Sequence, residues 1–429
     1  MDGVLRKVRG LLVFLMGCIC ALGSAAQIQS FVGAGGSAFA KGTGSAFIGD
    51  VVGADSICPG ETGRVGLTVD GLCFLKDNEY DGEHSNGYTL PGFWVEPRLT
   101  WQPVDGVRLE AGFHGLVFDG ANRYPCYAYH DIGRWKGGQY QSGAHLLPFL
   151  RAEAQVGRTR FVLGDIYGGT RHGLMEPLLN PEVDLSQDPE MGAQVLVGLR
   201  HWRMDAWINW QSYIFEDDLH QEVFTVGLSQ RLLLNGAGSG WHWYVPLDLV
   251  VQHRGGEQDR EELGLGVQTL VNWGVGAGLW WSGGGGVLRR LNVEAALIGC
   301  WQKDGGLWLY DSGLGGSLML NAYVGREWRI VGGVVAARRF VSLYGVPFYS
   351  TRSLNVEGAN FDGVLTPRVG GEWCHDFGGG YVLGARADVF VPCTGRITYA
   401  DGSVGAAARR TVFSFGLYFR CSPHWRLGR

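Results

Sequence analysis

The chain has 429 residues, 71 of which are glycine, and it carries a formal net charge of −5. Aromatic residues make up 12% of the sequence and charged residues 18%, against roughly 25% charged residues in ordinary globular chains. A mildly acidic chain without a basic cluster is not expected to bind nucleic acid, and its glycine and aromatic content favours strands, tight turns and membrane-interface positions.

The N-terminus has the three parts of a secretory signal peptide. Three basic residues within positions 6–9 precede an apolar run over 11–22, and small residues occupy 24–26. We therefore predict cleavage near Ala26, so that residues 1–26 are a signal peptide and the mature chain leaves the cytoplasm. The run is too short for a membrane anchor. A lipoprotein signal ending at Cys18 is the alternative.

The next segment, residues 27–62, is rich in Gly, Ala and Ser. It is compatible with first strands, a periplasmic arm or a plug, and its pattern does not choose among them. Nine cysteines are present, and seven remain after the signal peptide. They form no CxxC pattern, so we predict neither a metal site nor a cofactor. An oxidising compartment would allow a disulfide such as Cys58–Cys73 without requiring one.

Residues 203–211 show the alternation that recurs through the mature chain. Polar side chains would share one face and apolar ones the other: Arg203, Asp205, Asn209 and Gln211 against Met204, Ala206, Ile208 and Trp210. Only Trp207 interrupts the polar face. Because a strand turns successive side chains to opposite faces, this pattern predicts a strand between polar and apolar surroundings.

Similar segments, about ten to thirteen residues long, recur about 16 times, with a range of 14–18. The charged residues predicted to face the barrel lumen are Glu96, Arg98, Arg108, Glu110, Arg151, Glu153, Arg203, Asp205, Asp248, Arg254, Arg290, Glu294, Arg386 and Asp388. Such a mixed face has two interpretations. It lines a polar channel for small solutes, or its ions pair and fill a closed barrel.

The connections between these segments alternate in length. Tight turns are predicted at 104–105, 157–158 and 201–202, and long loops at 119–145 and 169–192. Outer-membrane barrels have short periplasmic turns and long outer loops in this order. Since an open strand edge would leave backbone groups unpaired in lipid, the sheet should close. We predict an all-β, transmembrane, antiparallel up-and-down barrel over residues 63–420, followed by a short tail at 421–429.

The long connection at 168–192 is the candidate constriction or lid loop. Its charged residues are Arg171, His172, Glu176, Glu182, Asp184, Asp188 and Glu190. The loop could enter the barrel and narrow it, hold Ca²⁺ with its carboxylates, or form an ordered outer lid. The outer lid is the favoured interpretation, and without EF-hand spacing no metal is predicted.

A catalytic site has weaker support in the sequence. His114, His253 and His375 lie on or beside predicted strands. Serine is scarce on the polar faces, and no G-x-S-x-G motif is present. We therefore predict that the chain is not an enzyme, with a barrel-embedded hydrolase as the minor alternative.

The last predicted strand places Thr411, Phe413, Phe415, Leu417 and Phe419 on one face. This strand resembles the signal read by barrel assembly machinery, although ten residues follow the final Phe. Together with the signal peptide and the alternating strands, it makes the chain similar to uncharacterised outer-membrane β-barrels of Gram-negative bacteria, of the Bacteroidota type and of porin-like architecture.

The resemblance implies residence in the outer membrane, with contacts to its lipid and to the barrel assembly machinery. It also implies passage of small polar solutes, and it leaves the oligomeric state open. We expect a porin-like channel, with a closed structural or docking barrel of the envelope as the alternative.

Overall fold

The computed structural model describes residues 57, 59–119, 126–128, 143–215, 220–235, 240–256, 266–283, 286–303, 306, 308–407 and 409–428. The predicted signal peptide, residues 27–56 of the segment that follows it, and Cys58 of the possible Cys58–Cys73 disulfide lie outside these residues.

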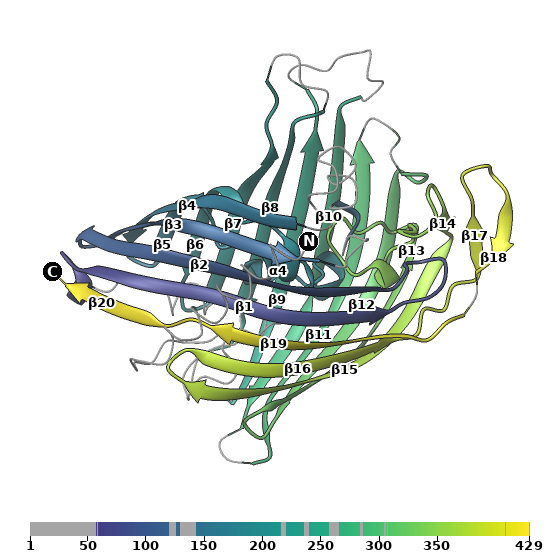
Figure 1. Cartoon of the computed structure of the whole chain (residues 1–429). Helices are drawn as coiled ribbons and strands as arrows, with labels where there is room; N and C mark the ends of the chain where they lie inside the picture. Colours follow the sequence, from purple (N-terminus) through teal and green to yellow (C-terminus); the bar gives the residue numbers. More distant parts are fainter. Residues whose placement is uncertain are drawn as a thin grey trace, which may run out of the picture.

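The described chain forms one closed antiparallel barrel (Figure 1). The sheet has seventeen strands, of which β19 and β20 lie one after the other along one edge of β1 and share a wall position, so the wall has sixteen. The opposite edge of β1 pairs with β2, which closes the ring. The predicted up-and-down barrel of about 16 strands is confirmed. The wall strands, in chain order, are β1 (Val65–Glu79), β2 (Tyr88–Val104), β3 (Val107–Phe118), β4 (Gly143–Val156), β5 (Thr159–Asp165), β6 (Met191–Gly198), β7 (Trp202–Ser212), β8 (Val223–Leu233), β9 (Trp241–Arg254), β10 (Gln268–Ser282), β11 (Leu288–Lys303), β12 (Ser312–Val324), β13 (Trp328–Arg338), β15 (Gly363–Gly378), β16 (Tyr381–Phe390), β19 (Val412–Cys421) and β20 (His424–Gly428).

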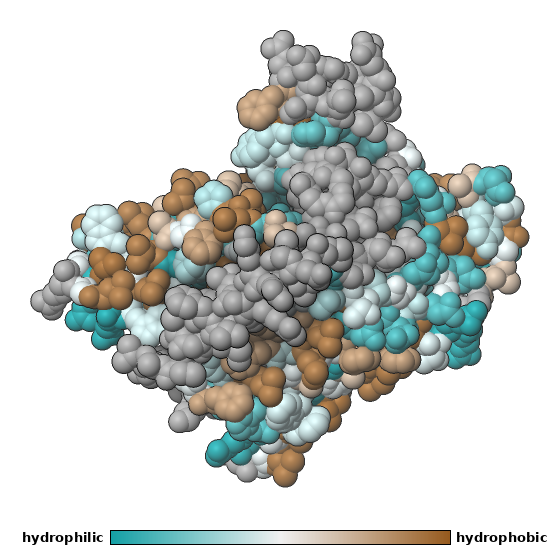
Figure 2. Space-filling model, in the orientation of Figure 1, coloured by the Kyte–Doolittle hydropathy of each residue, from teal (hydrophilic) through white to brown (hydrophobic). Residues whose placement is uncertain are grey.

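The two faces of the wall follow the alternation of the sequence. In β19, Phe413, Phe415 and Leu417 are among the exposed large apolar residues, whereas Ser414 and Tyr418 are buried on the lumen side. Brown, hydrophobic side chains accordingly gather on the outside of the wall (Figure 2). The residues at 421–429, predicted as a tail, contain β20, which pairs with the start of β1. No helix among the described residues is long and apolar enough to cross a membrane.

Short and long connections lie at opposite ends of the barrel. Turns such as 105–106, 157–158 and 379–380 join the strands at one end, and connections such as 166–190 and 339–359 join them at the other. Gly106 occupies its turn with φ of 76°, a conformation that side-chain-bearing residues rarely adopt. A small sheet of β14 (Asn360–Phe361), β17 (Arg396–Thr398) and β18 (Val404–Ala406) belongs to the long-connection end (Figure 1).

Two of the long connections fold into the lumen. We call residues 166–190 the first plug loop and residues 339–359 the second plug loop. The first contains the short helical turns η3 (Gly169–His172), η4 (Glu176–Leu178) and α4 (Val183–Ser186), and the second contains η6 (Pro347–Tyr349); η1 (Pro59–Glu61) precedes β1. Apolar residues from both loops, including Leu178, Val183, Phe340 and Leu343, join inward wall residues in the main buried cluster. The barrel therefore has a packed interior over part of its height.

The two plug loops also bind each other. The backbone N–H of Asn180 donates to the carbonyl oxygen of Tyr344 at 2.7 Å, and the hydroxyl of Ser342 donates to the carbonyl oxygen of Pro177 at 2.7 Å. A Cβ atom at Gly345 would overlap that same Pro177 oxygen. Glycine is required there because the two backbones approach so closely.

Candidate functional site

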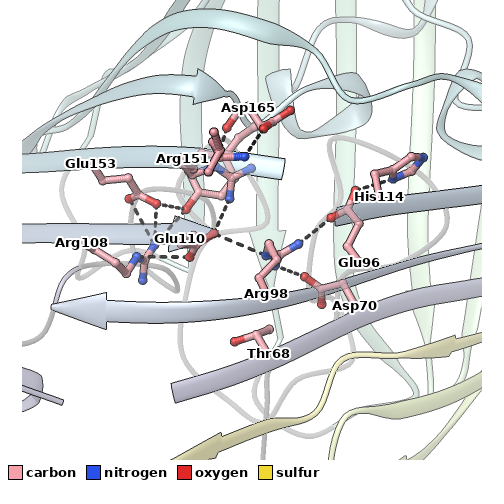
Figure 3. A network of polar contacts seen from close by, with 12 residues as sticks. Thr68, Asp70, Glu96, Arg98, Arg108, Glu110, His114, Arg151, Glu153 and Asp165 are labelled. Atoms are coloured by element: carbon pink, nitrogen blue, oxygen red, sulfur yellow. Dashed lines mark hydrogen bonds and ion pairs between the residues drawn. The ribbon is translucent and has the colours of Figure 1, made fainter. Parts of the chain in front are cut away.

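A network of opposite charges lines the inner face of β1 to β4 (Figure 3). Arg98 is at its centre, and its guanidinium contacts Asp70, Glu96 and Glu110; the distances to the Glu96 and Glu110 carboxylates are 2.5 and 3.4 Å. Arg98 is buried. A buried arginine with three carboxylates is neutralised by its neighbours, and planar guanidinium geometry suits such contacts.

The network continues toward β5 through further alternating charges. Nη1 of Arg151 lies 3.2 Å from Oε2 of Glu110, the same oxygen that Arg98 contacts. The carboxylate of Glu153 lies 2.9 Å from the guanidinium of Arg108 and 3.3 Å from that of Arg160. These contacts fix the wall side chains in place, so the groups at the edge of the network are held by a rigid support.

His114 lies at the edge of this network. Its Nδ1 atom is 2.8 Å from Oε1 of Glu96, whose other oxygen accepts from Arg98. Because a carboxylate only accepts hydrogen bonds, Nδ1 is the donor in this contact, which fixes the orientation of the ring. Within the described part of the chain, Nε2 is buried and has no hydrogen-bond partner. A histidine oriented in this way is built to accept a proton from a bound molecule.

A cavity of about 130 Å³ separates this part of the wall from the first plug loop. Its lining combines apolar, cationic and acidic side chains. The lining residues are Leu72, Trp94, Glu96, His114, Phe149, Arg151, Ile166, Gly168, Thr170, Arg171, Asp184, Gln187, Asp188, Pro189, Glu190 and Arg420. The volume is enough for several water molecules or one small polar group.

The carboxylates of the lining are held by protein groups. Asp184 accepts from the backbone N–H and the hydroxyl of Thr170, and burial raises the pKa of Asp184. Asp188 lies 2.6 Å from His145. Arg171, by contrast, places its guanidinium over the ring of Tyr167, 5.4 Å from the centroid. The lining acids thus already accept hydrogen bonds from protein groups, while Arg171 and Arg420 add positive charge to the lining.

The nucleophile in this site is best supplied by water. Serine does not occur among the described residues of the lining, and the hydroxyl proton of Thr170 is donated to Asp184.

The structure places the residues predicted to face the lumen as follows. Most of the fourteen are buried: Arg98, Glu110, Arg151, Glu153, Asp205, Asp248, Arg254, Arg386 and Asp388. The half-buried ones are Glu96, Arg108, Arg203, Arg290 and Glu294. Several of them contact the plug loops or each other. Asp248 accepts from Arg231 at 2.6 Å and from the backbone N–H of Met175 at 2.8 Å, and Arg386 donates to Asp388 at 2.6 Å.

The charged residues of the first plug loop contact the inner wall instead of forming an outer lid. His172 lies between Asp205 and Glu190, at 2.9 and 3.1 Å. Glu182 accepts from Asn78 at 3.0 Å and also from Tyr88. The remaining contacts pair Glu176 with Arg368 and Tyr349, and Lys76 with Glu182. In the structure the loop is an internal plug.

The three histidines considered for catalysis differ in their position relative to the cavity. His253 lies on β9 beside Thr269 at 3.1 Å, and His375 lies beside Glu327 at 2.7 Å and is half-buried. Only His114 of the three lines the cavity. Sequence reasoning did not pair it with Glu96, nor bring Thr170 and Arg420 to the same place. Across the described ranges, no group of three His, Cys, Asp or Glu side chains is arranged to hold a metal ion.

Comparison with known families gives this site its context. The sequence model of a family described as lipid A 3'-O-deacylase-type matches residues 57–429. The chain belongs to the lipid A 3'-O-deacylase-type family. The prediction that the chain is not an enzyme is thereby corrected, because this family is a family of enzymes. The predicted outer-membrane β-barrel is confirmed.

Solved barrels resemble this family member in fold. An anion-selective porin from Comamonas acidovorans is 10% identical over 84% of this chain and 100% of its own, with a TM-score of 0.46. OprD from Pseudomonas aeruginosa is 9% identical over 87% of this chain and 96% of its own, with a TM-score of 0.43. No curated protein sequence matches the chain.

Proposed function

We propose that this protein is an outer-membrane hydrolase that removes an ester-linked acyl chain from a phosphorylated glycolipid of the lipid A type. The observation that carries the proposal is the buried His114, whose Nδ1 is held by Glu96 at 2.8 Å while its Nε2 is unpaired among the described residues. Family membership supplies the substrate class, and the geometry supplies a base.

The reaction needs one water molecule and one proton acceptor. His114 Nε2 takes a proton from water as the oxygen attacks the ester carbonyl, and the positive imidazolium is stabilised by Glu96. The same proton then passes from His114 to the departing sugar oxygen as the ester C–O bond breaks. Water and ester are consumed, and a free fatty acid and an alcohol are formed. Positioned acid–base catalysis of this kind contributes about 10² to 10⁴ in rate.

The rest of the lining matches an amphipathic anion. Arg171 of the first plug loop supplies a guanidinium group for a negative oxygen of the substrate. Trp94, Phe149 and Ile166 supply apolar surface beside it for the first carbons of an acyl chain.

Passage of small polar solutes, the function expected from the alternation, has less support. The inner face is charged, as a channel requires, but both plug loops occupy the lumen and pack in its main apolar cluster. A closed docking barrel accommodates the plug loops. It gives no reason, however, for a cavity-lining histidine that Glu96 orients and whose Nε2 has no hydrogen-bond partner among the described residues.

The proposal is tested by lipid analysis in cells. Lipid A is extracted from a Gram-negative host that produces the full chain, and its acyl groups are counted by mass spectrometry. We expect loss of one acyl group with the natural sequence and none with His114→Asn. His253→Asn changes a histidine on another strand outside the cavity and should leave the deacylation unchanged. Identical lipid A in cells with and without the natural protein would refute the proposal.

A further inference from the structure

The barrel wall is much lower at β5 and β6 than beside them. β5 has 7 residues and β6 has 8, whereas β4 has 14 and β7 has 11. At roughly 3.3 Å per residue β5 extends about 23 Å along its axis. With a tilt of about 40° it rises about 18 Å, less than the apolar band of about 25 Å that a barrel presents to lipid.

Within the described residues, the neighbouring strands continue past this low wall without a strand paired on that side. The last β4–β5 pair toward the long-connection end is Arg151 with Gly164, while the described residues 143–150 of β4 pair only with β3. On the other side, β6 pairs with β7 up to Asn209. We call the space bounded by β4 residues 143–150, β7 residues 210–212 and the ends of β5 and β6 the wall notch.

Two successive positions on the β4 edge of the wall notch offer no free N–H for pairing with another strand. The backbone N–H of Leu150 points toward the β5 side and donates to Oδ2 of Asp165 at 2.6 Å. Alternate amides of a strand point the same way, so the next position on this edge is Pro148, which has no N–H to satisfy. At these two positions an acyl chain would therefore bury no unpaired N–H.

The surface around the wall notch is strongly apolar on the outside. Leu146 is 73% exposed, Leu150 61% and Leu163 65%. These residues lie on β4 and β5, which run next to β2 and β3 at the side of the barrel where brown side chains are prominent (Figures 1 and 2). Their surroundings are therefore the hydrocarbon of the membrane.

The wall notch is one strand away from His114. His114 pairs directly with Leu147 of β4, in the half of β4 that has no β5 partner. Adjacent strands are about 4.8 Å apart. The cavity beside His114 is lined by Phe149 of that same β4 edge, by Ile166 above β5 and by Pro189 above β6. The cavity thus reaches the residues that border the wall notch.

We propose that the wall notch binds an acyl chain of an outer-leaflet lipid and brings its ester to His114 from the side of the membrane. This inference rests on the proposed function for what happens to the ester, but binding of the chain depends on the wall alone. The lumen route is filled by the plug loops, and His145 of β4 holds Asp188 of the first plug loop at 2.6 Å beside the cavity.

The test uses a photoreactive benzophenone amino acid at Leu147 in the full chain, in outer-membrane vesicles that contain lipopolysaccharide and phospholipid. Leu318 faces lipid and is the positive control. Met319 is the matched negative control, because it is buried and β12 is paired on both sides. We expect lipid adducts at Leu147 and Leu318 and none at Met319. Adducts at Leu318 without any at Leu147 would overturn the inference.

Two additions keep the result decisive. The aromatic Phe149, which lines the cavity, takes the probe if the Leu147 variant does not give a folded barrel. The same labelling is repeated in His114→Asn, which is unable to act as the base. Adducts that persist in this variant while the natural protein releases no fatty acid would leave the lipid-binding wall notch standing and refute only the hydrolase.

Discussion

His172 of the first plug loop lies 2.9 Å from the carboxylate of Asp205 in β7. Its other ring nitrogen lies 3.1 Å from Glu190, and its ring stacks on Trp207 with centroids 3.5 Å apart. A loop residue between two acids and an aromatic ring ties the plug to the wall. The two carboxylates favour the protonated ring more strongly than burial opposes it, and they raise the pKa of His172 to about 9.

This raised pKa predicts a pH-dependent plug. Protonated His172 favours the folded loop, so its contribution is complete below the ordinary value of 6.5 and is lost as pH rises through about 9. The full contribution amounts to about 3 kcal/mol. His172→Gln should lower the thermal midpoint of the plug most at acidic pH, and the difference from the natural protein should shrink toward alkaline pH. A difference in thermal midpoint that grows with pH would contradict this stabilising role of protonated His172. His201→Gln, at an exposed turn, is the control.

Arg98 is predicted to be essential to the folded wall. Arg98→Met leaves Asp70, Glu96 and Glu110 without their shared cation, and breaking such a buried pairing costs about 3 to 5 kcal/mol. The heat resistance of the folded barrel, followed by gel electrophoresis, measures this loss of stability. Arg396→Ala removes an exposed pair with Asp362 and should cost less than about 1 kcal/mol. Equal losses in the two variants would show that the buried network does not support the wall.

Gly345 is predicted to control the fit between the plug loops. Gly345→Ala places a methyl group against the Pro177 carbonyl and should cost about 1 to 3 kcal/mol, as overpacking does. Gly332→Ala is a matched control, because nothing lies within 4 Å of its added Cβ, and its effect should stay within about 0.5 kcal/mol. Protease sensitivity of the two loops in folded protein reports the difference. Unchanged protease sensitivity of both loops in Gly345→Ala would mean that the two plug loops separate easily.

The plug loops should also determine conductance. In planar bilayers the natural protein should give no porin-like steps, because apolar residues of both loops pack in the lumen. Replacing residues 171–188 with a short Gly-Ser linker removes the first plug loop and should produce large steps from folded protein. Large steps from the natural protein would favour the solute channel expected from the sequence.

Much of the fold could be predicted from sequence because a barrel wall repeats one physical rule. Period-two alternation separates lipid from lumen at every strand, so residues such as Phe413 and Ser414 are assigned to opposite faces without knowledge of their partners. Trp207, the exception on its polar face, is explained only by the structure: it stacks on a histidine of a loop that enters the lumen.

The candidate site was harder to predict because it depends on register and on long-range contacts. Glu96 and His114 meet across the β2–β3 hairpin, whose pairing shifts between Trp101 and Val104 near the turn. A one-residue error there exchanges the two faces of a strand. Thr170 and Arg171 reach the cavity through a plug loop whose path depends on contacts such as that of Met175 with Asp248, and no local pattern encodes them.

Release of fatty acid by purified, folded protein in water enriched in ¹⁸O tests the hydrolase most directly. Lipopolysaccharide is the substrate, and mass spectrometry follows both the deacylated lipid and the fatty acid. If His114 activates water, the natural protein releases fatty acid that carries ¹⁸O in its carboxyl group, and His114→Asn lowers the rate by about 10² or more. Intact lipopolysaccharide after incubation with the natural protein, or equal rates for the two proteins, would contradict the assignment of His114 as the base.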